Sequence, residues 1–182
     1  MAGLVPAIHV LLAEWKTWMP GKGLASRRLW REASKGSIVN REDLVGVYRQ
    51  LGEEVVDATG KTIHSDRNRS SQIMYSADGY VGVVSTPSGR KKLANGGGRT
   101  DLAGATPEEL AEATRSVTCY AGHFELKGDE VHHHVEMALS PNLVGQTMIR
   151  RVQINGDDLT LSALPDTQGQ VRRILWRRVG AK

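Results

Sequence analysis

The chain has 182 residues, enough for one domain with a sizeable core, and its 20 Gly and 6 Pro are scattered, which excludes a collagen-like or long low-complexity protein. The net charge of +4 arises in residues 1–41, where seven basic and two acidic side chains give +5, so the rest of the chain sums to −1. A nucleic-acid-binding domain carries positive charge on its folded surface, and here only residues 172–178 are locally basic. Nucleic acid is therefore not an expected partner.

No apolar run reaches the roughly 18 residues that a membrane-spanning helix needs, so no membrane span is expected. Residues 3–13 are apolar, but no basic residue precedes them and they contain Pro6 and His9, which argues against a signal peptide. Cys119 is the only cysteine, so the chain cannot form an internal disulfide. These features fit a reducing compartment, and we expect a cytoplasmic protein.

Residues 1–41 differ from the rest of the chain and are predicted to be an N-terminal extension of a domain that covers residues 42–182. Residues 5–18 can form a short amphipathic helix that ends before Pro20. Two interpretations are open. The start of the chain is assigned too far upstream and the native chain begins near Met19 or later, or a helix packs across one end of the domain through Trp15, Trp18 and Trp30.

After this segment, strand-forming runs alternate with short turns that contain Gly, Asp or Asn, which indicates consecutive hairpins. The connection over residues 86–105 is long and rich in glycine. It is followed by Thr106-Pro107-Glu108-Glu109, a capping box that predicts a helix from residue 107 to about residue 115. Strands are expected over residues 44–56, 72–76, 80–85, 119–127, 130–139, 146–155, 158–163 and 170–179.

Residues 119–139 hold four of the six histidines and are predicted to form a hairpin whose two turn residues are Gly128 and Asp129. Because side chains alternate across a strand, the turn position assigns each residue to a face. The apolar face, expected to be buried, contains Tyr120, Gly122, Phe124, Leu126, Val131, His133, Val135 and Met137. The polar face, expected to be in water, contains His123, Glu125, His132, His134 and Glu136.

The histidines allow two functional interpretations. On the polar face, His123, His132, His134 and Glu136 are candidate metal ligands, since histidines at positions i and i+2 with a third across the ladder suit zinc. The alternative is an ordinary solvated outer face. On the apolar face, His133 is either a catalytic or ligand-orienting group in a pocket, or a core histidine hydrogen-bonded to a neighbour.

Arg150 presents a similar choice. In the strand over residues 146–155 it shares a face with Met148, Val152 and Ile154, which should be buried. A buried guanidinium requires an anionic partner. That partner is either a glutamate of the protein or an acidic group of a bound ligand.

The pattern predicts a mostly β fold, an antiparallel up-and-down barrel of about eight strands with the long loop and the helix across one mouth. A two-sheet sandwich is the alternative. An eight-stranded barrel has room for one small ligand.

Several short motifs of the chain form a recognisable set: 44–49 (LVGVYR), 75–80 (YSADGY), 106–109 (TPEE), 120–124 (YAGHF), 133–136 (HHVE), 140–146 (SPNLVGQ), 150–151 (RR) and 155–161 (NGDDLTL). Through these residues the chain resembles a family of bacterial lipocalin-like domain proteins with a calycin-type barrel. The similarity covers about residues 42–179 and does not extend to the N-terminal segment. The resemblance implies a barrel with an apolar cavity. One departure is Tyr48, which stands where a lipocalin carries Trp.

The first functional hypothesis is that the barrel binds a small hydrophobic molecule, which could also carry an acid group. No cofactor is expected, and the protein is expected to be a monomer or a homodimer. His133 and Arg150 would orient the guest, and the expected wall residues are Tyr48, Tyr75, Tyr80, Tyr120, Phe124, Val135, Met137 and Trp176. The alternatives are a cofactor-free isomerase or cyclase in which His133 transfers protons, a metal-binding protein, and a purely structural domain.

Overall fold

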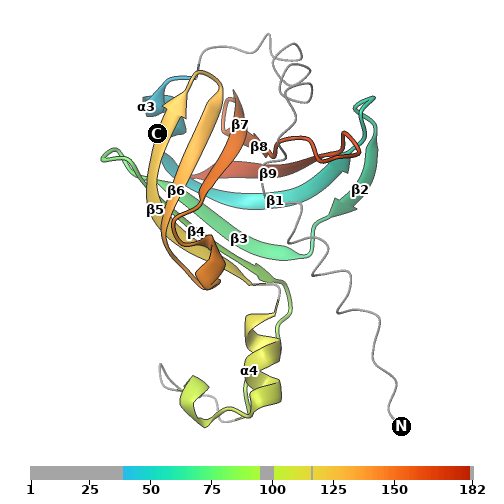
Figure 1. The fold of residues 1–182 in the computed structure, drawn as a ribbon, viewed down its shortest axis with the longest axis vertical. Helices are drawn as coiled ribbons and strands as arrows, with labels where there is room; N and C mark the ends of the chain where they lie inside the picture. The colour runs from blue at the N-terminus through green and yellow to red at the C-terminus, as the bar shows by residue number, and fades with distance from the viewer. Residues whose placement is uncertain (1–38, 95–100, 116, 181–182) are drawn as a thin grey trace.

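The protein forms a closed antiparallel β-barrel (Figure 1). The computed structural model describes residues 39–94, 101–115 and 117–180. Its strands lie in one sheet in the order β2-β1-β3-β4-β5-β6-β7-β8-β9, and β1 also pairs with β9, which closes the sheet. The strands are β1 (Gly46–Val56), β2 (Thr62–Asp66), β3 (Arg69–Tyr75), β4 (Tyr80–Pro87), β5 (Thr118–Lys127), β6 (Glu130–Ala138), β7 (Thr147–Asn155), β8 (Asp158–Ser162) and β9 (Val171–Val179).

The barrel has eight strand positions, because β2 and β3 occupy the same edge of β1. β2 pairs with the second half of β1, where Glu53 lies opposite Asp66, and β3 pairs with the first half, where Arg49 lies opposite Gln72. Each later strand pairs with its predecessor in the chain. The predicted up-and-down barrel of about eight strands is confirmed, and the alternative two-sheet sandwich is wrong. Residues 57–71, over which no strand was predicted, contain β2 and the start of β3.

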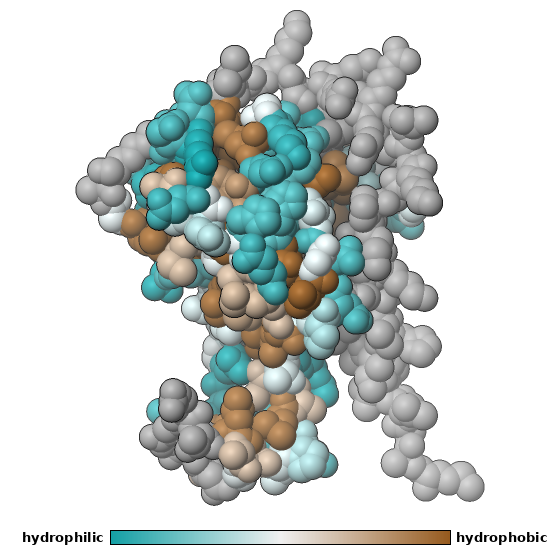
Figure 2. All heavy atoms as spheres, turned by 60° about the vertical axis from the view of Figure 1, so that its left-hand side comes forward, coloured by the Kyte–Doolittle hydropathy of each residue, from teal (hydrophilic) through white to brown (hydrophobic). Residues whose placement is uncertain are grey.

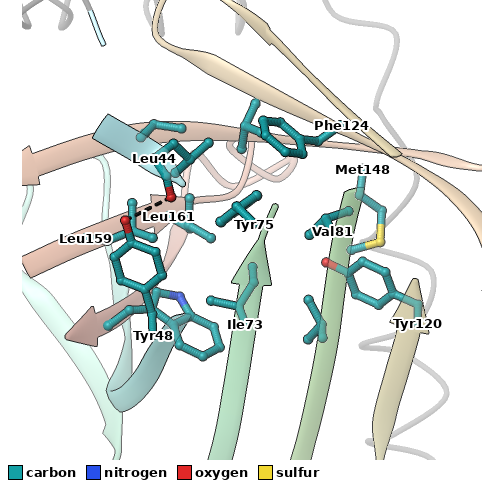
Figure 3. Close-up of a cluster of buried hydrophobic side chains, with 14 of the residues drawn as sticks. Leu44, Tyr48, Ile73, Tyr75, Val81, Tyr120, Phe124, Met148, Leu159 and Leu161 are labelled. Atoms are coloured by element: carbon teal, nitrogen blue, oxygen red, sulfur yellow. Dashed lines mark hydrogen bonds between the residues drawn. The ribbon is translucent and has the colours of Figure 1, made fainter. Parts of the chain in front are cut away.

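The barrel interior is the hydrophobic core, since the buried side chains alternate along each strand, as expected for a sheet with one buried face. Figure 3 shows Tyr48, Tyr75 and Tyr120 among these core side chains, with the Tyr48 hydroxyl directed to Leu44. The core contains Leu44, Tyr48, Ile73, Tyr75, Val81, Val83, Tyr120, Phe124, Val131, Val135, Met148, Val152, Leu159, Leu161 and Trp176.

A short helix, α3 (Arg41–Leu44), lies at the end of the barrel where β1 begins, a region that the sequence pattern had assigned to a strand from Leu44. Leu44 is fully buried in the core. The Tyr48 hydroxyl donates to the Leu44 carbonyl over 2.9 Å, and Arg178 lies 4.7 Å from the Tyr48 ring centre. Arg178 also donates to the carbonyls of Asp43 and Val45 at 2.6 Å and 2.5 Å, so one buried arginine joins α3 to β9.

The helix α4 (Pro107–Thr114) begins with the predicted capping box, in which the Thr106 hydroxyl accepts from the Glu109 amide and the Glu109 carboxylate accepts from the Thr106 amide. Its position differs from the prediction. In Figure 1 it extends away from the strand ends instead of crossing a barrel mouth, and none of its side chains is buried. Two short 3-10 turns complete the structure, η1 (Asp101–Gly104) and η2 (Pro141–Leu143).

The predicted N-terminal extension lies almost wholly outside the described residues, so it stays a prediction. Its last residues contact the barrel, because Val39 packs on the core and Arg41 donates to the Ala77 carbonyl. The described part of the chain contains no helix long and apolar enough to cross a membrane.

Candidate functional site

His133 lies in the barrel interior, and the β5–β6 hairpin places it there. Lys127 lies opposite Glu130 and Phe124 lies opposite His133, as the predicted turn requires. Val131 and Val135 are buried on the same face of β6, and His133 itself is only 1% exposed. A histidine in such surroundings must form its hydrogen bonds within the barrel.

Two tyrosines provide these bonds. The Tyr75 hydroxyl, from β3, lies 2.8 Å from Nε2 of His133, and the Tyr120 hydroxyl, from β5, lies 2.9 Å from Nδ1. Tyr75 also packs edge-on against the Phe124 ring, with the centres 5.0 Å apart. The three polar side chains are therefore joined in one buried network, Tyr75–His133–Tyr120, enclosed by aromatic and aliphatic residues.

Burial keeps this network uncharged. It lowers the pKa of His133 to about 3, and the nearby positive charge of Arg150 acts in the same direction. Burial raises the pKa of Tyr120 to about 12 and raises the pKa of Tyr75 well above its ordinary value. At neutral pH the imidazole is therefore neutral and both hydroxyls keep their protons.

Arg150 projects from β7 into the same interior, as its predicted face implies. Its neighbours in alternation, Met148 and Val152, are buried, and its charge acts on Tyr75 and Tyr120. One guanidinium nitrogen donates to the Ile149 carbonyl over 2.7 Å. Burial lowers the pKa of Arg150, which is the cost of keeping this cation inside the barrel.

Further polar residues line the half of the barrel away from α3, and their role there was not expected from the sequence. Ser71 and Ser85 are buried and hydrogen-bonded over 2.7 Å, and Arg69 donates to the Ser85 hydroxyl over 2.8 Å. On β1 and β9, Glu53 and Arg172 form an ion pair at 3.4 Å. Alternation along the strands could have identified three of them. Ser71 and Arg69 lie on the same face of β3 as Tyr75, and Arg172 lies on the same face of β9 as Trp176.

Trp176 is buried on β9, and its indole nitrogen Nε1 has no hydrogen-bond partner among the residues that the structure describes. An indole N–H can only donate. Buried indole groups usually find an acceptor, so this N–H is a donor available to an acceptor inside the barrel.

Most of the predicted wall residues are buried in the interior: Tyr48, Tyr75, Tyr120, Phe124, His133, Val135 and Trp176. Their role in binding a ligand stays a prediction. Tyr48 differs from the others, because its hydroxyl is already bonded to α3 and Arg178. It therefore belongs to the closed end of the barrel.

Two predicted wall residues face outward instead. Met137 is 61% exposed because β6 contains a bulge, with Gly122 opposite Val135 and Ala121 opposite Met137, so that Glu136 is the extra residue and the alternation shifts. Tyr120 consequently pairs with Ala138 and not with Met137. Tyr80 is 59% exposed because it pairs with the outward-facing His123. Figure 2 shows hydrophobic residues reaching the surface among hydrophilic ones on this side of the barrel.

The candidate metal ligands lie on the outer face, as predicted, but they do not converge. His123 is bonded to Glu136 at 2.7 Å and stacks on His134, with the ring centres 4.5 Å apart. His134 is bonded to Thr147, and His132 lies 3.3 Å from Glu130. In residues 39–94, 101–115 and 117–180, no three His, Cys, Asp or Glu side chains are grouped as metal ligands would be.

Comparison with known proteins now assigns the family. A model of the lipocalin-like domain matches residues 45–179, which include every strand of the barrel. The chain belongs to the lipocalin-like domain family. This agrees with the closed, sequentially paired barrel and with the resemblance noted in the sequence.

This lipocalin-like protein is similar to a 4'-hydroxy-3'-methoxypropiophenone carrier protein of Aspergillus oryzae, with 42% identity over 67 residues, 32% of this chain and 60% of the carrier. The similar region thus spans less than two thirds of that carrier. Among solved structures, a lipocalin-like protein of Bacteroides uniformis is 16% identical and an uncharacterized protein of Bacteroides eggerthii is 11% identical. Each has a TM-score of 0.39, and each alignment covers 75% of this chain and 99% of the other.

Proposed function

We propose that this lipocalin-like protein binds a small, mainly hydrophobic molecule inside its barrel. One observation carries the proposal: the Tyr75–His133–Tyr120 network and Arg150 face the interior of a barrel whose core is mainly aromatic and aliphatic. Ligand sites combine such walls with a few polar groups that fix orientation. Barrels of eight strands can hold one small ligand.

The chemistry of the interior favours an aromatic guest with a polar end. Tyr75, Tyr120 and Phe124 provide aromatic surface beside the His133 network. The similar Aspergillus protein is named as a carrier of a phenolic aryl ketone, which fits such surroundings in kind. Arg150 extends the proposal to guests that carry an acid group, because a buried guanidinium attracts a carboxylate.

A panel of ligands tests this proposal, with tryptophan fluorescence and native mass spectrometry as readouts. The panel contains 4'-hydroxy-3'-methoxypropiophenone, an aromatic acid and a medium-chain fatty acid. We expect saturable one-to-one binding of at least one of them. If none binds at concentrations below its solubility limit, the proposal is wrong.

A matched pair of variants on β6 then locates the site. Val135 is 3% exposed and faces inward, whereas Met137, two residues away, faces outward. Val135→Phe fills interior volume and should weaken binding by at least about tenfold, while Met137→Phe should leave it unchanged. Circular dichroism confirms that each variant is folded. Equal weakening by both variants would place the site outside the barrel.

A cofactor-free isomerase or cyclase is the second candidate, because both ring nitrogens of His133 are bonded to hydroxyls along which a proton could move. The pKa of His133, about 3, makes it a weak base, and general bases work best when their pKa lies near the working pH. Binding is therefore the better-supported function. Turnover of a bound ligand that disappears in His133→Gln would reverse this order.

Three further statements stay proposals on the basis of the sequence. The protein acts in the cytoplasm, since its one cysteine suits a reducing compartment. It acts as a monomer or homodimer. Residues 1–41 are an extension to the barrel domain of residues 42–182.

A further inference from the structure

The Tyr75–His133–Tyr120 network contains one proton more than its own hydrogen bonds use. A neutral imidazole has one N–H and one bare nitrogen. One tyrosine must therefore donate its O–H to the bare nitrogen, while the other accepts from the N–H. The accepting tyrosine keeps its own O–H unused. The two imidazole tautomers differ only in whether this surplus O–H is on Tyr75 or on Tyr120.

No described residue accepts this proton. Within residues 39–94, 101–115 and 117–180, the hydroxyls of Tyr75 and Tyr120 bond only to His133. The two side chains are 2% and 6% exposed, so the surplus O–H does not reach bulk water. A buried donor without an acceptor is unfavourable, which means that an acceptor inside the barrel stabilises the protein.

Two other polar groups of the interior have the same preference. The indole N–H of Trp176 lacks an acceptor in the described chain, and the guanidinium of Arg150 can only donate. Ser71 and Ser85, which can accept, are bonded to each other, and Ser85 also accepts from Arg69. At the other end of the barrel, the Glu53 carboxylate is paired with Arg172. The network, Trp176 and Arg150 therefore present hydrogen-bond donors to a molecule inside the barrel.

From this proton count we infer that the guest presents a carbonyl-type oxygen, of a ketone or a carboxylate, to the surplus hydroxyl of Tyr75 or Tyr120. The inference rests on the proposed function and specifies its ligand class. Because a tautomer change of His133 moves the donor between two strands, the same barrel can hold the oxygen at either of two positions. Guests of different length can then be accommodated without a change of charge.

Two probes of nearly the same shape test the inference, butyrophenone and butylbenzene, which differ by the carbonyl oxygen. Their affinities are measured by calorimetry and compared with their partition between water and cyclohexane, which removes the hydrophobic contribution. The partition coefficients predict a ratio between the affinities of butyrophenone and butylbenzene in the absence of a hydrogen bond. One net hydrogen bond is worth roughly fivefold in affinity, so the measured ratio should exceed this predicted ratio by about fivefold or more in favour of butyrophenone.

Infrared spectroscopy of carbonyl-labelled butyrophenone reads the bond directly in the wild-type protein. The bound carbonyl band should lie below its position in cyclohexane. Tyr75→Phe or Tyr120→Phe, whichever removes the tyrosine that contacts the guest, should move the band back and remove most of the fivefold preference. Tyr80→Phe is the matched control, because Tyr80 is outside the barrel, and it should change neither value.

Sodium 4-phenylbutyrate distinguishes the carboxylate form of the guest from the ketone. Arg150→Met should weaken its binding at least about tenfold more than that of butyrophenone if a carboxylate is the natural group, whereas equal weakening assigns a ketone. A bound carbonyl band at its cyclohexane position, with no preference over butylbenzene, overturns the inference and leaves the proposed function intact. Failure of all three probes to bind contradicts the inference, and failure of the earlier ligand panel as well contradicts the proposed function.

Discussion

Replacement of Gly122 by alanine should destabilise the protein strongly and also disturb the His133 network. Gly122 lies in β5 beside the bulge of β6. A Cβ atom at this position would lie well within 3.0 Å of the His134 carbonyl oxygen and 3.0 Å from the backbone nitrogen of Glu136. Both atoms belong to the backbone of the paired strand, so neither can rotate away as a flexible side chain could.

The expected loss of stability follows from the hydrogen bonds between β5 and β6. Real Cβ contacts are rarely shorter than 3.4 Å, so β5 and β6 must separate around the pairs Gly122–Val135 and His123–His134. Two or three backbone hydrogen bonds then weaken or break, at about 1 kcal/mol each. We expect a loss of about 2–3 kcal/mol in the free energy of unfolding, at the large end for single substitutions. Because Tyr120 and His133 lie on the same two strands, their hydrogen bond of 2.9 Å should lengthen.

Urea unfolding, followed by tryptophan fluorescence and circular dichroism, measures this loss. Gly82→Ala is the matched control, since Gly82 is in the adjacent strand β4 and its Cβ would only make an ordinary contact of 3.6 Å with the end of the Met74 side chain. The control should stay within about 0.5 kcal/mol of the wild type. Equal urea midpoints for the two variants would refute the argument that the bulge depends on glycine.

Three other predictions concern the end of the barrel, the buried histidine and the helix. Arg178→Met should cost about 2–4 kcal/mol in urea unfolding, because it leaves the Asp43 and Val45 carbonyls without their donor, whereas Arg177→Met at an exposed ion pair should change little. The pKa of His133 is about 3 in the folded state and 6.5 in the unfolded chain, so the unfolded chain takes up the proton first as the pH falls. The free energy of unfolding should therefore decrease between pH 6.5 and pH 3, by about 1.4 kcal/mol per pH unit. Urea midpoints between about pH 6 and pH 4.5 should show this slope in the wild type and not in His133→Gln; the same slope in both proteins would contradict the assignment. Thr106→Ala removes the capping box of α4, which buries no side chain, so amide exchange in the helix should accelerate while the urea midpoint stays constant.

The predicted orientation of the candidate site residues was correct where it depended on local alternation. His133, Phe124 and Val135 face inward because the turn at Gly128 and Asp129 fixes the register of both strands near it. The prediction failed at Met137, beyond the bulge, where one extra residue reverses the alternation. It also failed at Tyr80, because the strand carries apolar residues on both faces and the pattern does not choose between them.

The amino-acid sequence by itself determined the hairpins, the capped helix and the faces of each strand near its turns, because these depend on neighbours within a few residues and on a period of two. Only the tertiary structure decided that β9 returns to β1 and that Tyr75 and Tyr120 meet His133 from strands β3 and β5. Such contacts depend on how the strands curve and stagger when the sheet closes, which involves residues far apart in the chain. The surplus proton of the network could therefore not be predicted from the sequence, since it exists only when both hydroxyls bond to the same imidazole.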